Sequence, residues 1–402
     1  MKRVLIIWPL GTPFYFSDFW RSLLVYEVAA HVRKHGFEVD VFDGSEHKTF
    51  SELFELILAN NYDAIILSAP LDTMDGFSKT LKYIRMLDAN MPIYVYGLST
   101  LLSPKTFSAL DIQGYSNSGH FEKGILSFLG ARDIPANCVL KKYGTWKEYI
   151  REKETATDWS FMDIADAIKF TVLRISVSRG CQGGCNFCSC AILHGNHDIR
   201  KPVKDVCDYI AELEQSGYVG IIEFASPTFT IYKDWVKDFC VEYKKRNLKI
   251  RWRCVTRVDQ IDADTVKMMA EANCIRIGLG IETMAEEEQE ALHKKIQTER
   301  IVQAIKLLQR YHIEVLAYLI SGIEKQTCKN LAYTYKTLKE LGAISRITAL
   351  LRYSSLTFDD MIDTSIASDM CTSSLNKVLG LDNYDLLKLI IGTADLDEKY
   401  YK

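Results

Sequence analysis

The chain has 402 residues, 48% of them hydrophobic and 25% charged, and a formal net charge of −3. This length exceeds one ordinary hydrophobic core, so two or three domains are expected. The near balance of charges argues against a nucleic-acid or membrane-surface partner, since either would favour a basic excess. The first apolar run, Val4–Trp8, is too short for a signal peptide or a spanning helix, so a cytoplasmic protein is expected.

Strand and helix signals alternate through residues 1–130. The predicted strands cover residues 4–8, 37–42, 64–68 and 93–96, and the predicted helices cover residues 19–34, 51–59 and 79–88. Strands separated by helices of this length indicate a parallel sheet with right-handed crossovers. We therefore expect a Rossmann-like α/β domain over residues 1–130.

This rhythm is lost in residues 131–170, where Pro135 and the charged stretch at 151–158 predict a linker. A second α/β series then begins, with helices expected at residues 264–272 and 298–311. Its predicted strands lie at residues 172–177, 221–224, 250–255, 275–280, 315–319 and 347–351. Six βα units favour an open, partial (β/α)6 barrel over residues 171–353. Residues 354–402 are expected to form a helical C-terminal segment.

Eleven cysteines need an explanation in a chain expected to be in a reducing compartment. Most are scattered singly, and a lone cysteine is usually a small buried hydrophobe. Four lie close together just after the first barrel strand, in a loop rich in glycine: Cys181, Cys185, Cys188 and Cys190. Such a loop can wrap an iron–sulfur cubane, and three thiolates would leave one iron open for a substrate or cofactor. A zinc site with Cys190 as fourth ligand is the alternative.

The C-x-x-x-C-x-x-C spacing, with an aromatic residue before the last cysteine, resembles the radical S-adenosylmethionine (SAM) superfamily. The resemblance implies a [4Fe–4S] cluster held by Cys181, Cys185 and Cys188, with SAM chelating the open iron. It also implies reductive cleavage of SAM to a 5′-deoxyadenosyl radical that abstracts a substrate hydrogen. An electron donor such as flavodoxin or ferredoxin is then an expected partner, and Cys190 is expected to be a bystander.

Three later segments extend the resemblance. Residues 221–229 are similar to the element near the amino group of SAM, where Glu223 is the one polar contact expected. Residues 252–257 are similar to the strand whose arginine, here Arg257, meets the SAM carboxylate, a contact that suits a bidentate guanidinium. The segment Gly278-Leu-Gly-Ile-Glu282 is similar to the G-x-G-I-E strand end, which implies that Glu282 lies near the ribose hydroxyls.

The order of the domains resembles cobalamin-dependent radical SAM enzymes, but the cobalamin signature is eroded. The D-x-H-x-x-G motif is absent, and the turn after the fourth strand, Tyr96–Pro104, has one glycine and several leucines that would fill the corrin's space. Some such enzymes bind cobalamin without a histidine ligand, so bound cobalamin stays an open alternative. A degenerate cobalamin-binding-like domain kept for packing or substrate recognition is the preferred prediction.

The fate of the substrate radical depends on the protein rather than on the cofactor. The preferred prediction is Cα epimerisation in a ribosomally made peptide, with Cys371 returning the hydrogen and Cys328 or Cys254 as substitutes. One alternative is cobalamin-dependent methyl transfer in natural-product biosynthesis, and another is a non-catalytic zinc-binding protein. The expected substrate is a peptide or a small natural product.

Overall fold

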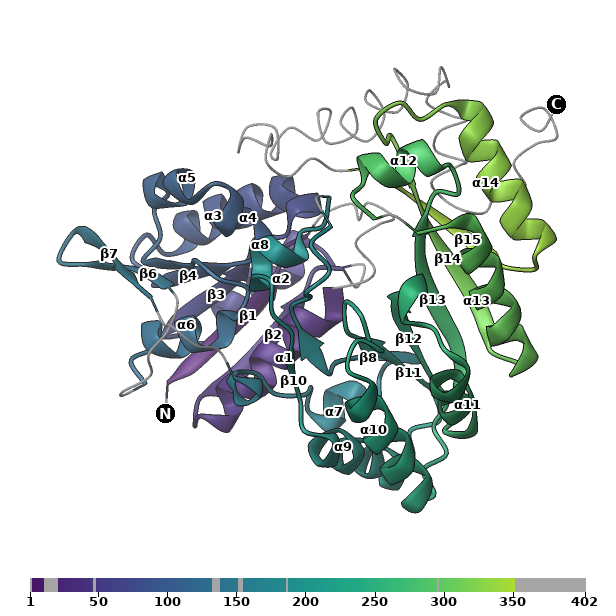
Figure 1. The fold of residues 1–402 in the computed structure, drawn as a ribbon. Coiled ribbons are helices and arrows are strands. Elements are labelled where there is room, and N and C mark those ends of the chain that lie inside the picture. Colours follow the sequence, from purple (N-terminus) through teal and green to yellow (C-terminus); the bar gives the residue numbers. More distant parts are fainter. Residues whose placement is uncertain are drawn as a thin grey trace. The chain divides into compact units, whose positions relative to one another are not determined.

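The computed structural model describes residues 2–10, 21–45, 48–131, 138–150, 155–185, 187–294 and 296–350. The described chain divides into two compact units, each with its own sheet (Figure 1). Unit 1 comprises the described parts of residues 1–166 together with residues 189–195. Unit 2 comprises the described parts of residues 167–188 and 196–352. The C-terminal segment 354–402, predicted to be helical, lies outside the described residues.

Unit 1 is built on a sheet in the order β2-β1-β3-β4-β5-β6-β7. Its first five strands are parallel: β1 Arg3–Trp8, β2 Glu38–Asp43, β3 Ala64–Ser68, β4 Ile93–Tyr96 and β5 Gly114–Ser116. The apolar runs that predicted strands are buried on both faces, as in β3, where every residue is buried. The Rossmann-like α/β prediction is confirmed, in the strand order 2-1-3-4-5 of flavodoxin-like sheets.

The helices of unit 1 supply the crossover connections that parallel pairing requires. They are α1 Arg21–Lys34, α2 Phe50–Ala59, α3 Met74–Leu87, α4 Leu98–Leu102, α5 Pro104–Ala109 and α6 Phe121–Phe128, with a 3-10 turn η2 at Leu71–Thr73. Helix α2 begins with a capping box, in which Thr49 and Glu52 satisfy each other's backbone N–H groups. One core cluster joins the sheet to α2, α3 and α5 through side chains that include Leu53, Phe77 and Phe107.

Residues expected to lie in a linker instead extend the sheet. Strands β6 Cys138–Lys142 and β7 Thr145–Tyr149 form an antiparallel hairpin that pairs with β5. Both residues of its turn, Tyr143 and Gly144, have positive φ, as a tight type I′ connection requires. The short, lysine-rich strands lack a strong apolar alternation, which is why the sequence pattern missed them. The short elements η3 Ala156–Asp158 and α7 Ile164–Ala167 follow.

Unit 2 contains a six-stranded parallel sheet in the order β15-β14-β13-β12-β11-β8. Its strands are β8 Val172–Ser176, β11 Ile221–Ala225, β12 Trp252–Arg257, β13 Cys274–Glu282, β14 Glu314–Ser321 and β15 Ile344–Ala349. Its helices are α9 Val203–Gln215, α10 Lys233–Lys245, α11 Ala263–Glu271, α12 Glu286–Ala291, α13 Thr298–Arg310 and α14 Cys328–Glu340. Within the described residues β15 does not pair with β8, so the sheet is an open, partial barrel, as predicted.

Side chains alternate between the two faces of this sheet. On β12, Trp252 is buried on the outer face, where its ring packs against Phe224 and against Phe239 of α10. Arg253 and Arg257 are half-buried on the other side, the inner face. Because successive strand residues point to opposite faces, the inner-face side chains of all six strands can be assigned from this register.

Candidate active site

The cysteine loop leaves the sheet of unit 2 just after β8. The two-residue strands β9 Ser178–Arg179 and β10 Ile199–Arg200 pair antiparallel and close its base. Between them Gly180 has φ +93°, and a Cβ there would lie 1.7 Å from the carbonyl oxygen of His197. Only glycine fits this position, for both backbone and steric reasons. The loop of 181–188 therefore starts from a tightly closed neck.

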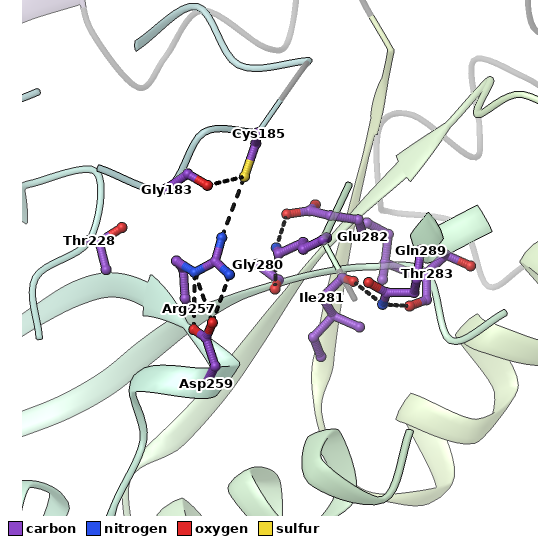
Figure 2. A network of polar contacts seen from close by, with 12 residues as sticks. Gly183, Cys185, Thr228, Arg257, Asp259, Gly280, Ile281, Glu282, Thr283 and Gln289 are labelled. Atoms are coloured by element: carbon purple, nitrogen blue, oxygen red, sulfur yellow. Dashed lines mark hydrogen bonds and ion pairs between the residues drawn. The ribbon is translucent and has the colours of Figure 1, made fainter. Parts of the chain in front are cut away.

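Polar groups surround two of the three sulfurs expected to bind a cluster. The Gly183 N–H donates to Cys181 Sγ over 3.3 Å, and the Thr228 hydroxyl lies 3.4 Å from the same sulfur. Arg257 Nη1 donates to Cys185 Sγ over 3.4 Å (Figure 2). Burial raises the pKa of the Cys185 thiol, while the charges of Lys294 and Arg257 oppose that rise. Cations and N–H donors of this kind stabilise thiolate ligands.

Three thiols within one short loop are the donor type that iron–sulfur clusters use. In the part of the chain that the structure describes, no three His, Cys, Asp or Glu side chains converge closely enough to hold a single metal ion. Cys188 is exposed, and Cys190 is buried at the start of helix α8 Cys190–His194, a segment that belongs to unit 1. The Gly119 N–H donates to Leu193 O of that helix over 2.7 Å. That Cys190 takes no part in holding a cluster stays a prediction.

Arg257 stands at the carboxyl end of β12, on the inner face. Its Nε and Nη2 atoms donate to the Asp259 carboxylate over 3.0 and 2.7 Å. Burial tends to raise the pKa of Asp259, but the bonds from Arg257 outweigh it and hold that pKa below its ordinary value. The carboxylate fixes the plane of the guanidinium and turns its Nη1 toward Cys185. Sequence reasoning identified Arg257 but missed Asp259.

Glu282 ends β13 in a left-handed conformation, with φ 66°. Such a conformation costs about 1–3 kcal/mol for a non-glycine residue and persists only where surrounding contacts hold it. Lys294 supplies them: its Nζ lies 2.6 Å from Glu282 Oε1 and 2.6 Å from Gly280 O. A Cβ on Gly280 would lie 2.8 Å from both charged groups, so a side chain there would displace the ion pair. Lys294 is a second residue that sequence reasoning missed.

Hydrogen bonds also hold the turn that follows Glu282. Gln289 Nε2 donates to Ile281 O over 3.0 Å and to Thr283 O (Figure 2). The Thr283 hydroxyl donates to Glu288. Each of these side chains is buried. The strand end therefore presents Glu282 from a rigid support, which is the condition for precise positioning of a ligand.

The remaining predicted site residues are Glu223 and the three candidate hydrogen donors, Cys254, Cys328 and Cys371. Glu223 lies on the inner face of β11, where its carboxylate accepts from Arg174 and Arg253. Its predicted contact with the amino group of SAM stays a prediction. Cys254 is 2% exposed on the outer face, opposite the side that carries Arg257, which argues against it as a hydrogen donor. Cys371 lies outside the described residues, and the structure does not describe the side chain of Cys328.

The carboxyl edge of the unit 1 sheet has features of a ligand site. Parallel α/β sheets bind ligands at this edge, where the strand order reverses. Gly97 follows β4 with φ +139°, and a Cβ there would lie 2.5 Å from Ala69 O, so the turns after β3 and β4 pack closely. In the same turns Thr73 Oγ1 and Ser99 Oγ are buried without a described partner. Of the leucines expected to block a corrin, Leu102 packs against the hydrophobic core, whereas Leu98 and Leu101 are half-buried.

Among the described helices, none combines the length and the apolar character needed to span a bilayer.

Comparison with known proteins identifies the domain that carries the cysteine loop. Residues 175–338 match the family model described as the radical SAM superfamily. An uncharacterized methyltransferase of Pyrococcus horikoshii is 28% identical over 177 residues, which cover 44% of this chain and 38% of that protein. Anaerobic magnesium-protoporphyrin IX monomethyl ester cyclase of Rubrivivax gelatinosus is 33% identical over 165 residues, 40% of this chain and 30% of that protein. The match thus spans about a third of the length of these relatives.

Solved structures share the fold of both units. The radical SAM methyltransferase TsrM from Kitasatospora setae, with cobalamin and a [4Fe–4S] cluster bound, superimposes with a TM-score of 0.70 at 12% identity. That likeness covers 88% of this chain and 77% of TsrM. The cobalamin-dependent radical SAM enzyme OxsB, with aqua-cobalamin bound, gives a TM-score of 0.66 at 15% identity over 95% of this chain and 58% of OxsB.

Proposed function

We propose that this chain is a radical SAM enzyme and, more specifically, a cobalamin-dependent methyltransferase. One observation carries the proposal: a single chain combines a 2-1-3-4-5 parallel sheet with an open six-stranded sheet that bears the cysteine loop. TsrM and OxsB, both solved with cobalamin, have this fold. None of the relatives named above is a peptide epimerase, so methyl transfer replaces epimerisation as the preferred reaction. The non-catalytic zinc-binding alternative is set aside, because the segment that carries the cysteine loop matches the radical SAM superfamily model.

The cysteine loop is the proposed cluster site. Cys181, Cys185 and Cys188 would hold the [4Fe–4S] cluster, which supplies the electron for cleavage of SAM when bound. The Gly183 N–H and the Arg257 guanidinium already donate to two of these sulfurs and would offset their negative charge. A reduced flavodoxin or ferredoxin is the proposed electron donor.

The carboxyl end of the unit 2 sheet is the proposed SAM site. Arg257 would pair with the SAM carboxylate through its guanidinium, held in plane by Asp259. Glu282 would accept from the ribose hydroxyls, and Lys294 holds that carboxylate in place. A Glu223 contact with the amino group would require its carboxylate to leave Arg174 or Arg253.

The carboxyl edge of the unit 1 sheet is the proposed cobalamin site, and cobalamin would carry the transferred methyl group. The described residues fit such a ligand in two respects. The hydroxyls of Thr73 and Ser99 are buried without described partners and can bond the polar edge of a bound molecule. Leu102, one of the leucines in the turn expected to obstruct the corrin, packs against the core instead.

The decisive experiment is anaerobic reconstitution with iron, sulfide and hydroxocobalamin, followed by gel filtration. Corrin absorption should travel with the protein, together with about four irons per chain. Addition of SAM and a reductant should then produce deoxyadenosine. The double variant Cys181→Ala/Cys185→Ala is the control, since it should keep the corrin but form no deoxyadenosine. A protein with a full cluster and no corrin would contradict the proposed methyl transfer.

A further inference from the structure

One arginine joins the neck of the cysteine loop to the segment that follows β11. Arg200 ends β10, where its Nε donates to Asp198 Oδ1 over 2.8 Å. The two charged side chains are only 6% and 0% exposed. The Nη1 and Nη2 atoms of the arginine donate over 2.7 Å to two backbone carbonyls, those of Phe229 and Thr228. Because a guanidinium is planar and its donors have fixed directions, these bonds hold that backbone in one position relative to β10.

Two aromatic rings pack against the same guanidinium. Its central carbon lies 5.1 Å from the ring centroid of Tyr232 and 5.3 Å from that of Trp235, within the range of cation–π attraction. The Tyr232 hydroxyl also accepts a hydrogen bond of 2.7 Å from Gln182 Nε2, in the cysteine loop. Trp235, on α10, donates from its ring to Lys201 O over 2.9 Å. An ion pair, two carbonyls and two anchored rings therefore fix the position of Arg200.

This support carries a hydroxyl that lies beside the first cysteine of the loop. Thr228 is 1% exposed, and its Oγ1 lies 3.4 Å from Cys181 Sγ. A thiolate has no proton to give, so the threonine hydroxyl is the donor when Cys181 serves as a ligand. The next residue, Phe229, donates its N–H to Val255 O over 3.0 Å. The backbone that carries the hydroxyl is thus held both from β10 and from β12.

We propose that Thr228 donates a hydrogen bond to the Cys181 sulfur and thereby raises the reduction potential of the cluster, with Arg200 as its positioning residue. A cluster gains negative charge when it is reduced, so a donor to its sulfurs stabilises the reduced form more than the oxidised form. Arg200 acts through the carbonyl of Thr228, which sets the direction of the hydroxyl. A less negative potential makes the cluster easier for the electron donor to reduce. This inference rests on the proposed cluster site and does not depend on the proposed cobalamin site.

Redox titration of the anaerobically reconstituted full chain, without SAM and followed by electron paramagnetic resonance, tests the proposal. Thr228→Val keeps the shape of the side chain but removes the donor, so the midpoint potential should become more negative. Thr228→Ser restores a hydroxyl and should return the potential toward that of the wild type. Arg200→Lys keeps the positive charge but cannot hold two carbonyls and a carboxylate in one plane. It should therefore shift the potential in the same direction as Thr228→Val.

A double variant separates positioning from a direct effect of the arginine. If Arg200 acts through Thr228, the shift in Thr228→Val/Arg200→Lys should equal the shift in Thr228→Val alone. Thr230→Val is the matched control, because Thr230 is also fully buried but its hydroxyl lies 2.6 Å from that of Thr256. Its potential should equal that of the wild type.

Three results would overturn the inference: an unchanged potential in Thr228→Val, a shift in Thr228→Ser equal to that in Thr228→Val, or the same shift in Thr230→Val. Additive shifts in the double variant would overturn the positioning role of Arg200. Iron content and circular dichroism verify the cluster and the fold of each variant, and Thr228→Ala carries the test if Thr228→Val takes up no cluster. A wild type without a cluster would contradict the proposed cluster site itself. A wild type with a cluster but no corrin would contradict only the proposed methyl transfer.

Discussion

Lys294 and Glu282 form an ion pair of 2.6 Å in which the two side chains are only 3% and 10% exposed. The lysine also bonds the carbonyl of Gly280, so one ammonium ties the strand to the residue that ends it. A buried charge left without its partner is strongly destabilising, whereas a matched pair is tolerated. The pair thus explains how Glu282 keeps a left-handed backbone at the position proposed for the ribose.

Replacement of Lys294 by methionine should therefore weaken SAM binding. The unpaired Glu282 would turn toward water or take up a proton, and the affinity of the reconstituted enzyme for SAM should fall at least about tenfold. Lys294→Arg should retain most of it. Equilibrium dialysis with labelled SAM measures the effect, and Lys336→Met, which loses an exposed contact to Glu340, is the control. Equal affinities of Lys294→Met and Lys336→Met would contradict the positioning role.

Replacement of any of the three loop cysteines should reduce iron binding, whereas replacement of their neighbour Cys190 should not. Cys181→Ala, Cys185→Ala and Cys188→Ala should each lose most of the iron and sulfide incorporated on reconstitution, because a cubane site needs all three thiolates. Cys190→Ala should keep the full content, because Cys190 starts α8 in the other unit. Iron and sulfide analysis with electron paramagnetic resonance of the reduced protein measures this. A deficit in Cys190→Ala equal to the others would indicate four ligands.

Gly180 should tolerate no side chain. Alanine there meets both a positive φ and a backbone oxygen 1.7 Å from its Cβ, so the neck of the loop must open. Gly217→Ala is the matched control, since Gly217 has φ +81° with nothing near its Cβ. The control should cost about 1–2 kcal/mol for the left-handed backbone alone. Urea unfolding should show a larger loss for Gly180→Ala, together with poor cluster incorporation. Equal losses in both variants would mean that the neck adapts.

The Arg257–Asp259 pair should give stability a specific pH dependence. The pKa of Asp259 is lower in the folded protein than its ordinary value of 3.8, so the folded state binds its proton less readily. The resulting stabilisation is complete above the ordinary pKa and is lost as the pH falls through it toward the folded pKa. The difference in unfolding free energy between wild type and Asp259→Asn should therefore be constant near neutrality and shrink below about pH 4. Urea titrations at several pH values measure it, and a pH-independent difference would contradict the pairing.

The sheets and the cysteine loop could be predicted from the sequence, because both depend on local sequence pattern. Apolar runs such as Val4–Trp8 specify strands buried on both faces. The spacing of the cysteine ligands lies within one loop, so it can be recognised without knowledge of the fold. The role of Lys294 could not be predicted from local pattern, because its contact with Glu282 forms only after the chain passes through a turn and the short helix α12. The face of Cys254 was predictable in principle, because alternation with Arg253 and Arg257 assigns it to the outer side. The hairpin of residues 138–149 was missed because its strands have little apolar alternation.

The hydroxyl of Ser99 tests whether the edge of the unit 1 sheet binds a corrin. It is buried in helix α4 without a described partner, so a ligand that supplies one would gain a hydrogen bond. Ser99→Val removes the donor and adds bulk, and should reduce the hydroxocobalamin retained after gel filtration while leaving iron content unchanged. Ser345→Val is the control, because Ser345 also has a buried hydroxyl without a described partner but belongs to β15 of unit 2. Equal corrin retention in the two variants would place the cofactor away from this edge.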